Sequence, residues 1–192
     1  PPLPSHATTP LRLEFTVPAD AVSVEIYRRP FGGYPQYDEN GGAARAPPTT
    51  LPEAGWTLTG VTASGASDEP AGRDYWCYAL VARDAHGNPS LVSNMTAGTL
   101  NYLLGDVSNG ITAGVGNNSV FTEDISLLGA HYGISGEVAV DTYDYLDVGP
   151  TLTGSASARP KPDDKVNFED LIIFAINYSL AGYQHPQFAA TP

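Results

Sequence analysis

The sequence has little cysteine, little lysine and no long apolar run. Cys77 is the single cysteine among 192 residues, which excludes an internal disulfide framework. The longest apolar run, Leu171 to Ile176, is far shorter than the roughly 20 residues that a membrane-spanning helix requires. We therefore expect no membrane span. If the chain is secreted, its less regular segments must be stabilised by something other than disulfides, and a metal ion is the obvious candidate.

Positive charge is also scarce. Nine Lys and Arg residues face 21 Asp and Glu residues, which gives a net charge of −12. Nucleic acids select basic surfaces, so this balance argues against a nucleic-acid partner. The charge is uneven along the chain. Residues 1–98 carry ten acids and six bases (net −4), whereas residues 99–192 carry eleven acids and three bases (net −8).

The change in charge and in residue pattern near Thr99 predicts two domains. Twenty glycines and 17 prolines without a collagen period indicate many turns and short strands, so we expect a mainly β protein with a small α part. The expected organisation is a Pro-rich N-terminal segment at 1–10, a β-sandwich at 11–99, a module of paired loop–helix repeats at 100–183, and a C-terminal tail at 184–192. Both terminal segments have a flexible, linker-like composition.

The first half shows the period-2 alternation of half-buried strands. Residues 11–17 and 22–26 alternate apolar with polar side chains, and residues 56–61 predict a further strand. Residues 75–82 carry two apolar sets, which predicts a strand that is buried on both faces. A turn at 84–89 then leads into a Ser-rich strand at 90–93.

The stretch Tyr78-Ala-Leu-Val-Ala-Arg-Asp-Ala-His-Gly-Asn-Pro-Ser90 resembles the F strand and FG turn of fibronectin type III domains. Val24-Glu-Ile-Tyr-Arg-Arg29 is similar to the C strand of that family. The resemblance covers about residues 10–98 and implies a β-sandwich. It also implies a tyrosine-corner role for Tyr78, whose hydroxyl would bond to nearby backbone.

Catalytic patterns are missing from the sequence. It contains no Gly-x-Ser-x-Gly, no His-Glu-x-x-His and no glycine-rich phosphate loop, and its four histidines are scattered. Cys77 lies in the middle of a predicted strand, where a thiol is usually buried and inert. We therefore expect no enzyme. Phe31, Tyr34 and Tyr37 could stack on a sugar ring, although a loop packed by its own aromatic residues is the more common arrangement.

Two segments of the second half align without gaps. Residues 117–132 lie over residues 163–178 with Val, Glu, Asp and Tyr coinciding, and Gly136 matches Gly182. In each copy a polar loop leads into an apolar segment, which predicts helices at 122–132 and 168–180. The second helix is apolar nearly all round, so more than one partner must cover it.

The repeated acids predict calcium ligands. Calcium prefers six to eight oxygens, and a loop of Asp and Asn side chains that ends in the first turn of a helix supplies them. A carboxylate at that place also suits the positive end of the helix dipole. Two equivalent sets of candidate ligands follow, and Ser119 and Lys165 would contribute backbone carbonyls: Asp106, Ser108, Asn117, Ser119 and Asp124 in the first copy, and Asp147, Asp163, Lys165 and Asp170 in the second.

Gly105-Asp-Val107 and Lys165-Val-Asn-Phe-Glu-Asp-Leu171 resemble dockerin modules, which carry paired EF-hand-type calcium loops. The resemblance covers about residues 102–183 and implies Ca²⁺ and a cohesin-like partner. Both loops carry insertions after the opening Asp. Asn118 and Asp164 replace the usual glycine, and both residue types tolerate the left-handed turn. The alternative is that these acids are helix caps and solvated loop residues without an ion.

Three functions stay open. The first is a non-catalytic, calcium-stabilised extracellular or cell-surface subunit that assembles with copies of itself. The second is a docking module of a larger secreted enzyme with a cohesin-like partner. The third is a sugar-binding accessory module. Asn-x-Ser/Thr sequons at Asn94, Asn117 and Asn177 make a glycoprotein possible.

Overall fold

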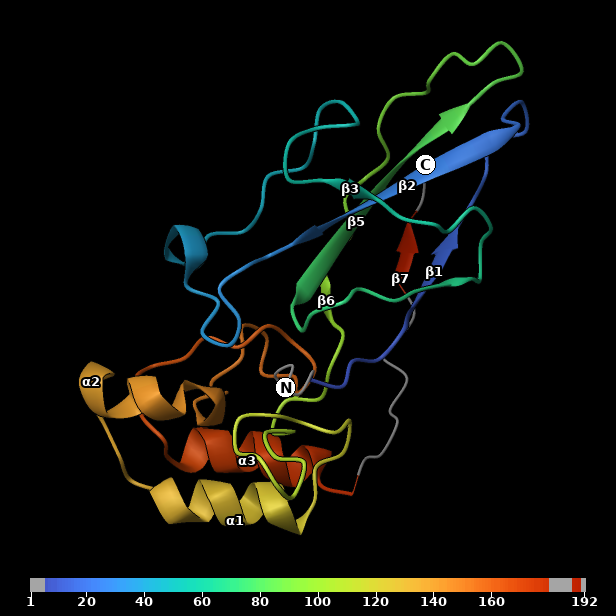
Figure 1. The fold of residues 1–192 in the computed structure, drawn as a ribbon. Helices are drawn as coiled ribbons and strands as arrows, with labels where there is room; N and C mark the ends of the chain where they lie inside the picture. Colours follow the sequence, from blue (N-terminus) through green and yellow to red (C-terminus); the bar gives the residue numbers. More distant parts are fainter. Residues whose placement is uncertain (1–5, 180–187, 191–192) are drawn as a thin grey trace, which may run out of the picture.

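The computed structural model describes residues 6–179 and 188–190 and is mainly β with a small α part. The sheets and the helices gather at opposite ends of the molecule (Figure 1). The described strands are β1 (Leu11–Phe15), β2 (Ser23–Pro30), β3 (Thr57–Leu58), β4 (Ser67–Asp68), β5 (Tyr75–Arg83), β6 (Thr99–Leu100) and β7 (Phe188–Ala190). The described helices are α1 (Thr122–His131), α2 (Glu137–Val140) and α3 (Phe168–Asn177), with 3-10 segments η1 (Glu39–Gly42) and η2 (Asp141–Leu146).

The larger sheet has the order β3-β2-β5-β6 and is antiparallel. The β2–β5 pair is its longest, running from Ser23 opposite Arg83 to Pro30 opposite Trp76. Every residue from Cys77 to Ala82 is buried, which confirms the prediction that this strand has two covered faces. The smaller sheet has the order β4-β1-β7, in which β7 pairs parallel to β1.

Several strands differ from the prediction. The strand predicted at 11–17 ends at Phe15, and only Thr57–Leu58 of the stretch 56–61 pairs as a strand. Residues 90–93 hydrogen-bond to β5 without forming a regular strand, because the hydroxyls of Ser90 and Ser93 accept the N–H groups of Ala82 and Leu80. Serine side chains thus replace part of the backbone ladder.

Further expectations are corrected. The hydroxyl of Tyr78 donates to the Asp68 carboxylate (2.9 Å) and not to nearby backbone, so the tyrosine-corner role is wrong. Within the predicted C-terminal tail, residues 188–190 form β7. The helix predicted at 168–180 ends at Asn177, because Tyr178 has a non-helical ψ of 136° and Ser179 has a left-handed φ of 64°. The match at Gly182 lies outside the described residues.

The end of the N-terminal segment is packed between the two halves. The N–H of Ala7 donates to the carbonyl of Gly116 (3.2 Å), and the N–H of Thr9 donates to the carbonyl of Asn101 (2.7 Å). Thr9 is buried. Residues 7–9 therefore differ from the flexible segment that their composition predicts, because their backbone groups are used in contacts with the second half of the chain.

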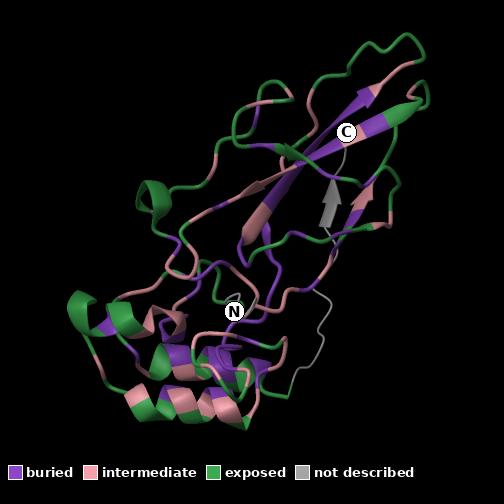
Figure 2. Cartoon of the chain, viewed as in Figure 1, coloured by how far each residue is buried: buried purple, intermediate pink, exposed green. Residues whose placement is uncertain are grey.

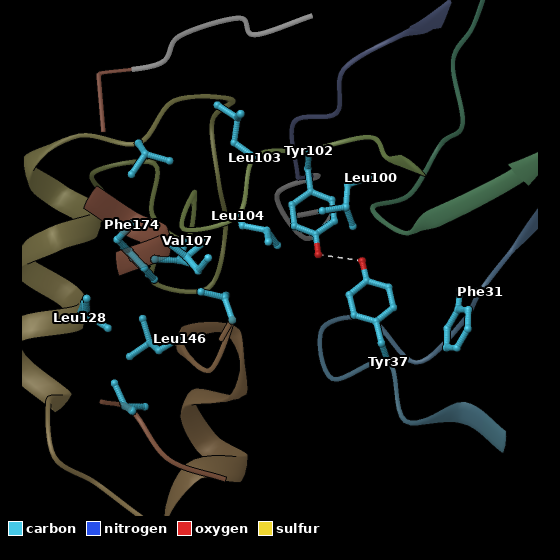
Figure 3. Close-up of a cluster of buried hydrophobic side chains, with 14 residues drawn as sticks. Phe31, Tyr37, Leu100, Tyr102, Leu103, Leu104, Val107, Leu128, Leu146 and Phe174 are labelled. Atoms are coloured by element: carbon cyan, nitrogen blue, oxygen red, sulfur yellow. Dashed lines mark hydrogen bonds between the residues drawn. The ribbon is translucent and has the colours of Figure 1, made fainter. Parts of the chain in front are cut away.

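One hydrophobic cluster joins the sheet end to the helical end (Figure 3). Phe31 and Tyr37, from the long connection after β2, belong to this cluster, and the hydroxyls of Tyr37 and Tyr102 are hydrogen-bonded at 2.7 Å. The connection is therefore packed by its own aromatic residues, and Phe31 and Tyr37 are too buried to stack on a sugar. The cluster's other buried members are Leu100, Leu103, Leu104, Val107, Val120, Leu128, Leu146, Val148, Val166, Ile173 and Phe174.

The two repeats bind each other reciprocally. The N–H of Gly133, just after α1, donates to the carbonyl of Val166 in the second copy (2.8 Å). The N–H of Ser179, just after α3, donates to the carbonyl of Val120 in the first copy (2.9 Å). Since these four residues occupy equivalent positions in the aligned repeat, the copies are related by an approximate twofold arrangement around the core.

Candidate functional site

The aligned acids lie in two loops and in the first turns of the helices that follow them. We call the loops loop 1 (residues 106–121) and loop 2 (residues 147–167). Loop 1 leads into α1 and loop 2 leads into α3. Asn118 and Asp164, the residues that replace the expected glycine, have φ angles of 67° and 60°. The left-handed turn that the sequence predicts at these two positions is confirmed.

The aligned acid in the first turn of each helix accepts hydrogen bonds through both of its oxygens and acts as a hydrogen-bond hub. Oδ1 of Asp124 accepts the N–H groups of Val107 and Ser108, and Oδ2 accepts that of Phe121, all at 2.8 Å. Asp170 repeats this pattern with Val148, Gly149 and Asn167, again at 2.8 Å. Each carboxylate therefore fastens the start of its loop to the N-terminus of the following helix.

Both hubs are completely buried. Burial raises the pKa of the Asp124 and Asp170 carboxyls, whereas the backbone N–H bonds act in the opposite direction. Because three of the roughly four lone-pair positions of each carboxylate already accept hydrogen bonds, little of either group is left for a metal ion. The contacts of Asp124 and Asp170 are thus those of the helix-cap alternative.

The opening acid of loop 1 has a partner from the first half of the chain. Asp106 is buried and accepts the N–H groups of Asn117 (2.8 Å) and Asn118 (2.7 Å). Its Oδ2 also accepts a hydrogen bond from Nη2 of Arg73, and this ion pair is fully buried on both sides. The negative charge of Asp106 is therefore balanced inside the protein.

The opening acid of loop 2 has no such partner among the described residues. Asp147 is as deeply buried as Asp106, but the N–H groups of Asp163 and Lys165 lie at 3.4 and 3.3 Å from its oxygens. Burial, and next the charge of Asp170, raises the pKa of Asp147 to about 7. Loop 2 therefore holds a carboxyl whose charge is poorly compensated.

Asp163 also lies in loop 2. Its Oδ2 accepts a hydrogen bond from Nζ of Lys165 (2.5 Å), in a pair that is partly exposed to solvent. Its Oδ1 is buried and has no hydrogen-bond partner within the described chain. A buried oxygen of this kind is what a bound cation would satisfy.

The remaining predicted ligands contribute less. Ser108 uses its backbone N–H to bind Asp124, and its hydroxyl accepts the N–H of Gly110. The side chain of Asn117 is exposed, and Ser119 is half-buried. Within residues 6–179 and 188–190, no three His, Cys, Asp or Glu side chains are grouped as metal ligands. Loop 1 therefore does not fit a calcium ion, whereas loop 2 retains Asp147 and the free oxygen of Asp163.

Two buried arginines at these loops were not predicted from the sequence. Arg73 reaches from the sheet end into loop 1, and Arg159 reaches from loop 2 back to the connection after β2. There Nη1 and Nη2 of Arg159 donate to the carbonyls of Tyr37 (3.0 Å) and Gly42 (2.8 Å), and its guanidinium lies over the ring of Phe31. No local sequence pattern marks either arginine, because every partner is distant in the chain.

Comparisons with protein-family models, curated protein sequences and solved structures find no match for this chain. Within the part of the chain that the structure describes, no helix has the length and apolar character needed to cross a membrane.

Proposed function

We propose that the chain is a non-catalytic, extracellular structural module that joins a larger assembly through the exposed face of α3. One observation carries this proposal. Phe168, Ile172 and Ile176 follow one another at four-residue spacing on the outer side of α3, with exposed fractions of 63%, 41% and 57%. A surface helix normally turns polar residues to the solvent, so an apolar outer face marks a contact with another protein.

The neighbouring surface extends this face. Ile125 and Thr122 of α1 line a shallow hollow of about 370 Å³ together with Ala175 and Tyr178 of the α3 side. The two helices lie side by side at the end of the molecule that is farthest from the sheets (Figure 1). Figure 2 shows that α3 carries both exposed and buried positions. A partner could therefore cover α3 and fill the hollow in the same contact.

Charge favours a partner protein with a basic rim over a second copy of the chain. The half of the chain that carries α3 has a net charge of −8, and Glu169 is exposed beside the apolar face. Self-assembly, the first of the functions expected from the sequence, would bring two surfaces of like charge together. A cohesin-like docking partner is consistent with this choice, whereas the buried Phe31 and Tyr37 do not favour the sugar-binding alternative.

In this proposal, calcium binds at loop 2 and not at loop 1. Asp147 and Asp163 would hold the ion, which would neutralise two acids and fasten the loop to the start of α3. Calcium should then raise the melting temperature of the wild-type chain relative to chelator. This shift should disappear in Asp163→Asn and persist in Asp84→Asn, a control in an exposed turn. Equal melting with calcium and chelator would remove calcium from the proposal without affecting the role of α3.

The role of α3 is tested by photo-crosslinking in the extracellular fraction of the source organism. Benzoylphenylalanine replaces Ile176 in one variant and Leu91, which is 93% exposed in a loop at the sheet end, in the control. We expect a protein adduct at position 176 only, and at least tenfold weaker binding of that purified partner by Ile172→Glu. Equal adducts at both positions, or an adduct with a second copy of the chain, would overturn the proposed contact.

A further inference from the structure

Arg73 binds Asp106, the residue that the calcium-loop resemblance implies as the first ligand of loop 1. It lies two residues before β5, and its side chain is almost completely buried at the junction of the two halves. Nη1 donates to the carbonyl of Asp106 (2.6 Å), and Nη2 donates to the carboxylate of the same residue. The guanidinium thus binds both the backbone and the side chain of the residue that opens the loop.

The other contacts of Arg73 hold it in this place. Nε donates to the carbonyl of Ala7 (2.9 Å), and the guanidinium carbon lies 4.9 Å from the ring centroid of Tyr102. A Cβ at Gly116 would collide with Arg73 and with Asp106, so only glycine allows the loop to close this tightly around the guanidinium. The chain therefore provides a fitted space for the arginine.

A buried carboxylate needs a cation close by, and either a metal ion or a guanidinium can supply it. Arginine is suited to this task because it keeps its charge when buried and donates in a planar fork. Asp106 has this cation from within the chain, whereas its counterpart Asp147 has none among the described residues. The two loops therefore share a left-handed turn at Asn118 and Asp164 but differ in what neutralises the opening acid.

We propose that the Arg73 guanidinium replaces the metal ion in loop 1, so that this loop is closed without metal and is locked to the first half of the chain. The resemblance to paired calcium loops implies two equivalent ion sites. The contacts of Asp106 contradict this at loop 1. The proposal holds whether or not loop 2 binds calcium, and it does not depend on what contacts α3.

A cation site should open in loop 1 when the guanidinium is removed. Asp106 would then lose its internal cation, and the Oδ1 of Asn118, which is buried without a hydrogen-bond partner in the described chain, would be available as a further ligand. Asp106 and Asn118 are already held in position by the turn of the loop, so an added ion would meet oxygens that are partly arranged for it.

The test is a Tb³⁺ luminescence titration of the full chain. We expect Arg73→Ala to bind one more Tb³⁺ per chain than the wild type, and the double variant Arg73→Ala/Asp106→Asn to lose this added ion. Calcium should raise the melting temperature of Arg73→Ala by more than that of the wild type. Arg73→Lys, which keeps the positive charge, should bind no added ion.

A folded Arg73→Ala chain without an added ion would overturn the proposal. A second measurement uses the wild type alone, in case that variant fails to fold. The Nε–H resonance of Arg73 should be slow to exchange and should keep its chemical shift in chelator and in calcium. A shift of this resonance on addition of calcium, with loss of its protection from exchange, would show that the ion displaces the arginine and would also overturn the proposal.

Discussion

Loop 1 and loop 2 present equivalent acids on equivalent backbone turns, yet each neutralises its opening acid in its own way. In loop 1 the buried guanidinium of Arg73 binds Asp106. In loop 2 the nearest described cation is Lys165, which is half-exposed and pairs with Asp163. The acids that both copies of the repeat share therefore specify the turn and the helix cap. The counter-charge of Asp106 in loop 1 is specified separately, by Arg73, a residue outside the repeat.

The largest effect that separates the two loops should come from Arg73→Ala. Removing one partner of a buried ion pair leaves Asp106 uncompensated, at a cost of about 3–5 kcal/mol in the free energy of unfolding. Urea unfolding followed by circular dichroism in chelator measures this loss. Arg12→Ala is the matched control, because Arg12 pairs with Glu14 at the surface and such a pair contributes about 0–1 kcal/mol. Equal losses in the two variants would contradict the distinction.

A feature that the loops share should give matching effects. Asp124→Asn and Asp170→Asn each replace a buried oxygen acceptor by an amide. Each should lower the free energy of unfolding by about 1–3 kcal/mol, because a backbone N–H loses its charged partner. Glu137→Gln in the exposed part of α2 serves as the control. A large loss in one repeat only would show that the two hubs are not equivalent.

The charge of loop 2 should be visible as a pH effect. The pKa of Asp147 is raised from 3.8 to about 7 in the folded chain, so the protonated carboxyl stabilises the fold. This contribution is complete below about pH 4 and is lost as the pH rises through about 7. In chelator we expect the melting temperature of the wild type to fall by several degrees over this range, relative to that of Asp147→Asn. Parallel pH curves for the two proteins would contradict the raised pKa.

The smallest effect is expected on the outer face of α3. Ile172→Glu and Ile176→Glu change exposed side chains and should alter the free energy of unfolding by no more than about 0.5 kcal/mol. Ile173→Ala, on the buried face of the same helix, should cost about 2–5 kcal/mol. Thermal and urea unfolding of the three variants measure the contrast. A large loss in Ile172→Glu would indicate that this face is packed within the chain.

Local patterns predicted much of this structure. Alternation identified β1, β2 and the doubly buried β5, and the aligned repeat placed α1 and α3 and the left-handed turns at Asn118 and Asp164. These features depend on residues that are close in sequence, where spacing carries the information.

The partners of Arg73, Arg159 and Tyr78 were not predictable in this way. Each uses a side chain to reach residues on another element, and no periodicity records such a pairing. The acids of the loops show the same limit. Their positions are evident from the repeat, but whether Asp106 meets a metal ion or an arginine depends on how the two halves pack.

Arg73 and Arg159 cross the junction in opposite directions, and the hydrophobic cluster lies between the same halves. A mechanical force applied to the sheets would therefore be transmitted to α3 through packed side chains and two buried arginines, and not through a flexible linker. Domains that are joined by flexible linkers reorient freely, and the linkers extend under force. The two halves of this chain would instead move as one rigid unit, so a partner bound at α3 would keep a fixed angle and distance from the sheets.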